Sequence, residues 1–207
     1  MRGFVIGLLL GLLILPASAW WWLRYGHPPV AVTDPRLPME KQIVSVPLHA
    51  RIDREMPAHA AMDANPANLL LGAEVYRQQC AGCHGLYGRP SAFGAHMFPQ
   101  SPQLWAPHGH GVVGVSDDPP GETYWKVKNG IRLSGMPSYK DILNETQMWQ
   151  VSVLLANADK QLPADVLAVL QQPLVAVATP GADSAAPSRP TVIPVQPPIP
   201  VQPLPSE

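Results

Sequence analysis

The sequence predicts an all-α protein with one small folded domain, an N-terminal membrane-spanning helix and a proline-rich C-terminal tail. Three observations carry this prediction: apolar residues at helical spacing after Asn65, a capping box at Asn144, and no charge in residues 3–23. The 26 prolines among 207 residues crowd into two stretches, one before Asn65-Pro66 and one from Pro173 to the end. The stretch between them, about a hundred residues, suits one domain.

Residues 1–25 are predicted to be a membrane anchor, because about 20 apolar residues cross a bilayer as a helix. A cleaved signal sequence is the alternative, since residues 17–19 (Ala-Ser-Ala) have the form of a cleavage site. The apolar run continues through three tryptophans to Arg24 and Tyr25, which resembles an interfacial aromatic belt and favours an uncleaved anchor. Either segment would export the rest of the chain.

Residues 26–64 are predicted to be a proline-rich tether. X-Pro steps favour extended or turn conformations, and only Gln42–His49 alternates enough to suggest a short strand or an extended docking segment. We therefore expect a spacer that keeps the folded domain off the bilayer.

The folded domain is predicted over residues 65–160. Asn65-Pro66 supplies an N-cap and a first-turn proline, and Leu69, Ala73, Tyr76 and Cys80 then share one helix face. A glycine within this helix, Gly72, costs about 1 kcal/mol relative to alanine, so we expect a second helix to approach closely there.

That second helix is predicted from Asn144 to about Asn157, with Trp149 against the Gly72 and Tyr76 face. A third candidate helix covers about Gly121 to Asn129. The loop over residues 85–118 is too long to stand alone in a compact domain and must wrap something.

Two segments follow the domain. Residues 161–172 are predicted to form a short amphipathic helix that lies against the domain or a partner. Residues 173–207 carry almost no charge and nearly repeat an Ile-Pro-Val-Gln-Pro unit, as expected of an extended tail or of a strap along a partner.

Cys80-Ala81-Gly82-Cys83-His84 contains the only two cysteines of the chain and matches C-x-x-C-H, the attachment motif of c-type haem. Two thiols three positions apart can join the vinyl groups of one haem, and the adjacent imidazole can bind its iron. A zinc site would need a second ligand pair at suitable spacing, which His108 and His110 do not supply. A thioredoxin-type pair would need a strand before the motif, where the pattern predicts a helix; a disulfide is the remaining alternative.

Met136 is the candidate for the sixth iron ligand, because Gly135 and Pro137 flank it in a loop between two predicted helices. The alternative role is a methionine that fills a gap in the core. His96 and Met97 are the runner-up ligands, and His108 and His110 are expected to be solvated loop residues.

These features together resemble a class I monohaem cytochrome c domain, most closely the small bacterial domains grouped with the haem subunits of cytochrome oxidase. The resemblance covers about Asn65 to Asp159. It implies three or more helices around one covalently bound haem, an exposed haem edge, His84 as proximal ligand and Met136 as distal ligand. A prolyl carbonyl usually orients the proximal imidazole in such domains, and Pro90, Pro99 and Pro102 each qualify. The expected pocket wall comprises Leu104, Trp105, Ile131 and Tyr139.

The predicted function is one-electron transfer by a membrane-tethered cytochrome rather than catalysis by an enzyme, because two protein ligands leave the iron no open site. We expect a bacterial inner-membrane protein with its haem on the periplasmic side, acting as a carrier or within a respiratory or photosynthetic complex. Redox proteins are the expected partners, and a net charge of −1 gives no reason to expect nucleic acid. Two alternatives remain: a haem enzyme or ligand sensor in which Met136 dissociates, and an assembly subunit whose haem is mainly structural.

Overall fold

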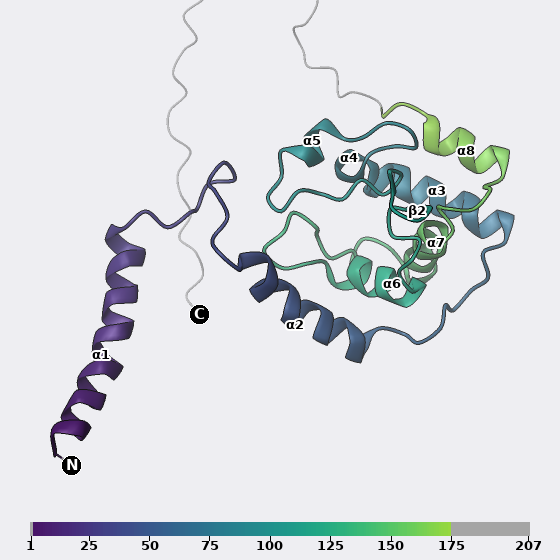
Figure 1. Ribbon diagram of the computed structural model, residues 1–207. Coiled ribbons are helices and arrows are strands. Elements are labelled where there is room, and N and C mark those ends of the chain that lie inside the picture. Colours follow the sequence, from purple (N-terminus) through teal and green to yellow (C-terminus); the bar gives the residue numbers. More distant parts are fainter. Residues whose placement is uncertain (1, 175–207) are drawn as a thin grey trace, which may run out of the picture. The chain divides into compact units, whose positions relative to one another are not determined.

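The computed structural model describes residues 2–174, which contain eight helices and one small hairpin (Figure 1). The helices are α1 (Arg2–Tyr25), α2 (Glu40–Glu55), α3 (Pro66–Gln79), α4 (Ala81–His84), α5 (Ala92–Ala95), α6 (Pro120–Asn129), α7 (Glu145–Leu155) and α8 (Ala164–Gln171). Strands β1 (Pro107–His108) and β2 (Val112–Val113) pair antiparallel. The predicted C-terminal tail, apart from Pro173 and Leu174, lies outside the described residues.

The core forms where α3 packs against α7 and α8, and where α6 packs against α7. Residues from each of these helices contribute to one buried cluster, in which Ala73, Tyr76, Val151 and Leu154 are fully buried. The side chain of Asn65 caps α3, and Asn144 and Gln147 form the expected capping box of α7. The prediction of an all-α domain is therefore confirmed.

Helices α3 and α7 approach each other as closely as Gly72 predicted. The residue of α7 that faces Gly72 differs from the prediction. A Cβ atom at Gly72 would lie 2.4 Å from the backbone oxygen of Gln150, so the two backbones meet there. Trp149, which we expected at this contact, instead stacks on Tyr124 of α6 with ring centroids 4.2 Å apart. The backbone of α7 approaches α3 closely, so the large indole packs toward α6 instead.

The prediction of a strand or extended segment over Gln42–His49 is wrong, because these residues belong to helix α2. The α2 helix contains Pro47, a residue that disfavours helix interiors. Tertiary contact outweighs this cost: α2 packs against α6, and Ile52 is 1% exposed. The extended part of the predicted tether is therefore shorter than expected.

The long loop after the cysteine motif contains the one-turn helix α5 and the β1–β2 hairpin. Farther along the chain, α8 lies against α3 and buries Val166 and Leu170 completely. The sequence left open whether this short helix lies against the domain or against a partner. In the structure it lies against the domain.

Helix α1 has 24 residues and a mean hydropathy of 2.1 over its most apolar window, so it is long and apolar enough to cross a membrane. A signal sequence would meet the same criterion.

Candidate haem and metal site

Helix α3 delivers both cysteines to one turn of the chain. Cys80 ends α3, and the backbone N–H groups of Cys83 and His84 donate to the Cys80 carbonyl at 3.1 and 2.9 Å. Both thiols are free and half-buried. Burial, with a smaller effect of the neighbouring Cys83, raises the pKa of the Cys80 thiol to about 12. The unmodified Cys80 is therefore neutral at pH 7, unlike the activated thiolate of a redox-active pair.

The imidazole of His84 is oriented by two oxygen atoms. Its Nδ1 lies 2.8 Å from the carbonyl oxygen of Pro102 and 3.0 Å from Oγ of Ser101. Because a carbonyl can only accept, the proton resides on Nδ1 and Nε2 is left with a lone pair for a metal. Burial lowers the pKa of His84, which keeps the ring neutral. Of the candidates Pro90, Pro99 and Pro102, Pro102 is the proline whose carbonyl contacts the imidazole.

The segment after the motif packs directly onto it. A Cβ atom at Gly94 in α5 would lie 2.0 Å from the Cys83 carbonyl oxygen, so only glycine fits this contact. The Gln103 side chain donates to the Cys83 carbonyl at 3.3 Å and accepts from the Ser91 backbone N–H at 2.6 Å. Our sequence analysis missed Ser91, Gly94 and Gln103, since nothing in their spacing marks them.

The loop that carries Met136 is held by its own backbone. Gly130 has φ of +68°, and a Cβ atom there would lie 2.7 Å from the carbonyl carbon of Pro137. The Met136 carbonyl accepts from Ile131 N–H at 3.2 Å, and Met136 N–H donates to Ser134 Oγ at 3.2 Å. The half-buried Met136 thioether thus extends from a loop that is fixed on both sides.

Tyr139 ties this loop to the cysteine motif. Its hydroxyl donates to the Gln79 carbonyl at 2.8 Å, immediately before Cys80, and its N–H donates to Val127 in α6 at 3.0 Å. Burial, the largest cause, raises the pKa of Tyr139 to about 12, so the hydroxyl keeps its proton. The hydrogen bond from the Tyr139 hydroxyl to the Gln79 carbonyl, which joins the loop to the end of α3, therefore persists at neutral pH.

The other predicted site residues are placed as follows. Leu104 and Trp105 are buried, and Trp105 packs edge-on against Tyr76 with centroids 5.5 Å apart; Ile131 is half-buried. The runner-up ligand Met97 is also half-buried, and its methyl group lies 2.0 Å from where a Cβ atom of Gly135 would be. The side chain of His96 is exposed.

The histidines of the hairpin lie apart from these groups. His108 and His110 are exposed, and the His108 ring contacts the Gly114 carbonyl at 2.6 Å. Within residues 2–174, no cluster of three or more His, Cys, Asp or Glu side chains could hold a metal ion. The zinc alternative therefore has no ligand set in this part of the chain.

The donor chemistry fits a covalently bound haem. The motif supplies two free thiols on one turn for the porphyrin and an imidazole with a free Nε2 for the iron. A soft thioether is available from a fixed loop.

One comparison with known proteins agrees with this arrangement. Residues 67–155 match the family model described as cytochrome c oxidase, cbb3-type, subunit III. Residues 67–155 form a monohaem c-type cytochrome domain. Such a domain implies haem c as cofactor and electron transfer as activity. Searches of curated proteins and of solved structures found no match to this chain.

Proposed function

We propose that this protein is a membrane-tethered monohaem cytochrome c that transfers one electron at a time on the periplasmic side of a bacterial inner membrane. It acts as a carrier or as the haem subunit of a respiratory or photosynthetic complex, and its partners are redox proteins. The observation that carries the proposal is the orientation of His84, whose Nδ1–H is held by Pro102 so that Nε2 is free.

Four side chains have roles in holding the cofactor. Cys80 and Cys83 would form the two thioether links, and His84 and Met136 would supply the protein ligands of the iron. When bound, the haem supplies the reversible exchange of one electron between ferric and ferrous iron. Leu104, Trp105, Ile131 and Tyr139 exclude water from the pocket that surrounds it.

The arrangement of the protein ligands favours electron transfer over catalysis at the iron. Met136 is held through both its N–H and its carbonyl, and Tyr139 anchors the same loop to Gln79. A backbone held on both sides limits the positions of the thioether, which favours a ligand that stays bound over one that leaves the metal open. This is the physical basis for preferring a carrier to a sensor or a haem enzyme.

The membrane assignment rests on α1 and on the chemistry of attachment. The helix ends in an aromatic stretch suited to the lipid–water interface. Haem c is joined to its cysteines on the exported side of the membrane, which supports a periplasmic location for the cytochrome domain.

Spectroscopy of the full-length protein purified with its cofactor tests the proposal. We expect a low-spin ferric spectrum, a reversible titration with n = 1 and haem that remains bound after denaturation. Cys80→Ala and Cys83→Ala should each remove one of the two covalent links, which mass spectrometry of haem peptides detects. A high-spin resting spectrum with rapid CO binding would instead support a sensor or enzyme.

A further inference from the structure

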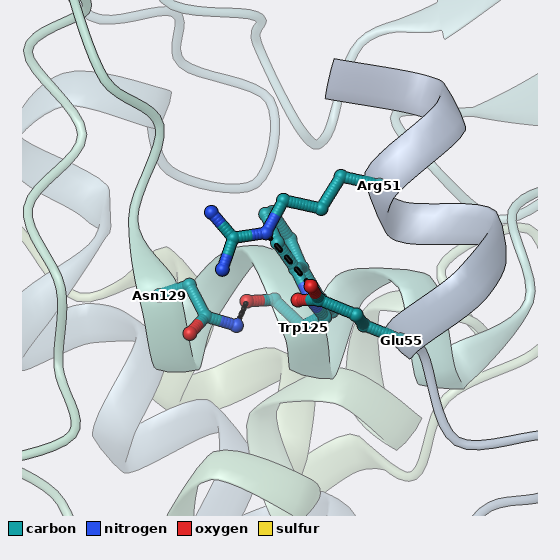
Figure 2. A network of polar contacts seen from close by, with 4 residues as sticks. All are labelled: Arg51, Glu55, Trp125 and Asn129. Carbon is teal, nitrogen blue, oxygen red and sulfur yellow. Dashed lines mark hydrogen bonds and ion pairs between the residues drawn. The ribbon is translucent and has the colours of Figure 1, made fainter. Parts of the chain in front are cut away.

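Helix α2 is docked on the cytochrome domain through a specific polar contact, shown in Figure 2. Trp125 Nε1 of α6 donates to Glu55 Oε2 at 3.0 Å, and Arg51 Nε bonds the same carboxylate at 2.8 Å. The Arg51 guanidinium also lies 5.9 Å from the Trp125 ring centroid. Ile52 is buried at 1% exposure.

The chain that follows α2 is fixed as well. A Cβ atom at Gly121 in α6 would lie 2.0 Å from the Pro57 carbonyl oxygen, so backbone meets backbone there. One side of α2 therefore packs against the domain. Ser45, Leu48 and Ile52 lie on this side, at spacings of three and four residues, and all are at least half-buried.

The opposite side of α2 is apolar in the first half of the helix, where it has no partner in the described part of the chain, and carries the exposed Arg54 in the last turn. Ile43 and Val46 are 64% and 67% exposed, and Pro47 is exposed beside them. Their i, i+3, i+4 spacing aligns them in one stripe, about half a turn away from Ile52.

The exposed apolar residues continue back along the chain toward α1. Val30, Val32, Leu37 and Met39 are 88%, 56%, 44% and 66% exposed. Solvent-exposed apolar side chains in such density mark a contact surface. The charged residues here balance in sign: Asp34 and Glu40 against Arg36 and Lys41.

Chain length limits where this surface can lie. Residues 26–39 alone separate the end of α1 from the start of α2, and even a fully extended chain of that length reaches only about 50 Å. If α1 spans a bilayer, its Trp20–Trp22 and Tyr25 end lies at the lipid–water interface. The exposed apolar segment begins within a few residues of that interface.

We propose that the outer stripe of α2, formed by Ile43, Val46 and Pro47, rests in the lipid–water interface and holds the docked cytochrome domain against the membrane. The helix lies between two surfaces: its Ile52 side faces α6 and its Ile43 side faces lipid. Lipid is the occupant favoured over a protein because the apolar surface is continuous along the chain with a membrane span and carries no net charge to select a partner. The inference rests on the proposed membrane anchoring.

Spin-label accessibility in the full-length haem protein tests this proposal. Val46→Cys is labelled with a nitroxide in phosphatidylcholine–phosphatidylglycerol vesicles, and collision with oxygen and with a water-soluble nickel chelate is compared. The matched control is Glu74→Cys, at an exposed position of α3. If Val46 faces lipid, oxygen contact exceeds nickel contact several-fold relative to the control.

Three other results would overturn the proposal. Equal, water-like accessibility at both positions, with the protein still embedded and low-spin, rejects the lipid contact and leaves the proposed function intact. Low accessibility to both reagents at Val46 identifies a protein partner or a second copy instead. Release of the protein by alkaline carbonate rejects the anchoring itself, and with it this inference.

Discussion

At the scale of single residues, His84, the proposed proximal ligand, is distinguished by its two oxygen neighbours. The Pro102 carbonyl accepts from Nδ1–H at 2.8 Å, and Ser101 Oγ lies 3.0 Å from the same nitrogen. Because that nitrogen carries the proton, the hydroxyl acts as a second acceptor. Acceptors at this position make an imidazole a stronger donor to its metal and so stabilise the more oxidised state.

Ser101→Ala should therefore raise the reduction potential. The Pro102 contact still orients the ring, so the spectrum should remain low-spin while the midpoint of a redox titration moves upward. Ser116→Ala, which removes a hydroxyl that accepts from Val113, is the control and should leave the midpoint unchanged. An unchanged or lower midpoint in Ser101→Ala would show that this hydroxyl does not act on the histidine.

Tyr139→Phe tests the link between the Met136 loop and α3. Loss of the hydrogen bond to the Gln79 carbonyl should lower the free energy of unfolding by about 1 kcal/mol. Chemical denaturation monitored by circular dichroism and Soret absorbance measures the loss. An unaltered unfolding midpoint would mean that solvent replaces the contact at no cost.

At the scale of elements, the helices differ in how far their own sequence determines them. α3 and α7 begin with asparagine caps, and α6 ends at Gly130, so their bounds follow from local signals. α2 contains Pro47, and its N-cap residue, Met39, makes no side-chain hydrogen bond. Its helical state depends on Ile52 and on Trp125, a residue far away in the chain, and no local pattern could predict it.

The candidate site shows the same division. Cys80, Cys83, His84 and Met136 are predicted as site residues from motif and loop composition, which are local signals. The contacts that orient them were not: Ser101 and Gln103 reach the motif only through the path of a long loop, and Tyr139 meets Gln79 across the domain. Residues that act through tertiary contact carry little signal of their own.

The docking of α2 should weaken in acid. Hydrogen bonds from Arg51 and then Trp125 lower the pKa of Glu55 below its ordinary value of 4.5. The Arg51 bond lies within α2, so the Trp125 bond from α6 is the part of this lowering that docking adds. A carboxyl whose pKa is lower in the docked state contributes stability above its ordinary pKa and loses it as pH falls through the lowered value. Amide exchange of residues 40–55 should therefore speed up relative to α7 below about pH 4.5. Glu55→Gln should abolish this additional acid dependence, and its persistence in that variant would contradict the assignment.

At the scale of the whole molecule, the folded unit is larger than the cytochrome match. The match covers residues 67–155, yet Ile52 of α2 and Val166 and Leu170 of α8 are completely or almost completely buried. The chain thus adds one helix before the cytochrome domain and one after it. The first lies between α1 and the domain, and the second closes the core over α3.

Leu170→Ala should destabilise the domain by about 3 kcal/mol, within the range for truncating a fully buried leucine. Thermal unfolding of the haem-loaded protein measures the effect. The exposed Leu71→Ala in α3 is the control, with an expected loss well below 1 kcal/mol. Equal effects of the two variants would show that α8 is not part of the cooperative unit.

The most direct test of the central claim is to identify the residue that completes the iron coordination. Reduced-minus-oxidised and near-infrared spectra should be recorded for the wild type, Met136→Ala and Met97→Leu, together with redox titrations. We predict that Met136→Ala alone loses the thioether–iron charge-transfer band and changes its midpoint potential, while Met97→Leu keeps both. A band that survives in Met136→Ala and disappears in Met97→Leu would contradict the assignment of Met136.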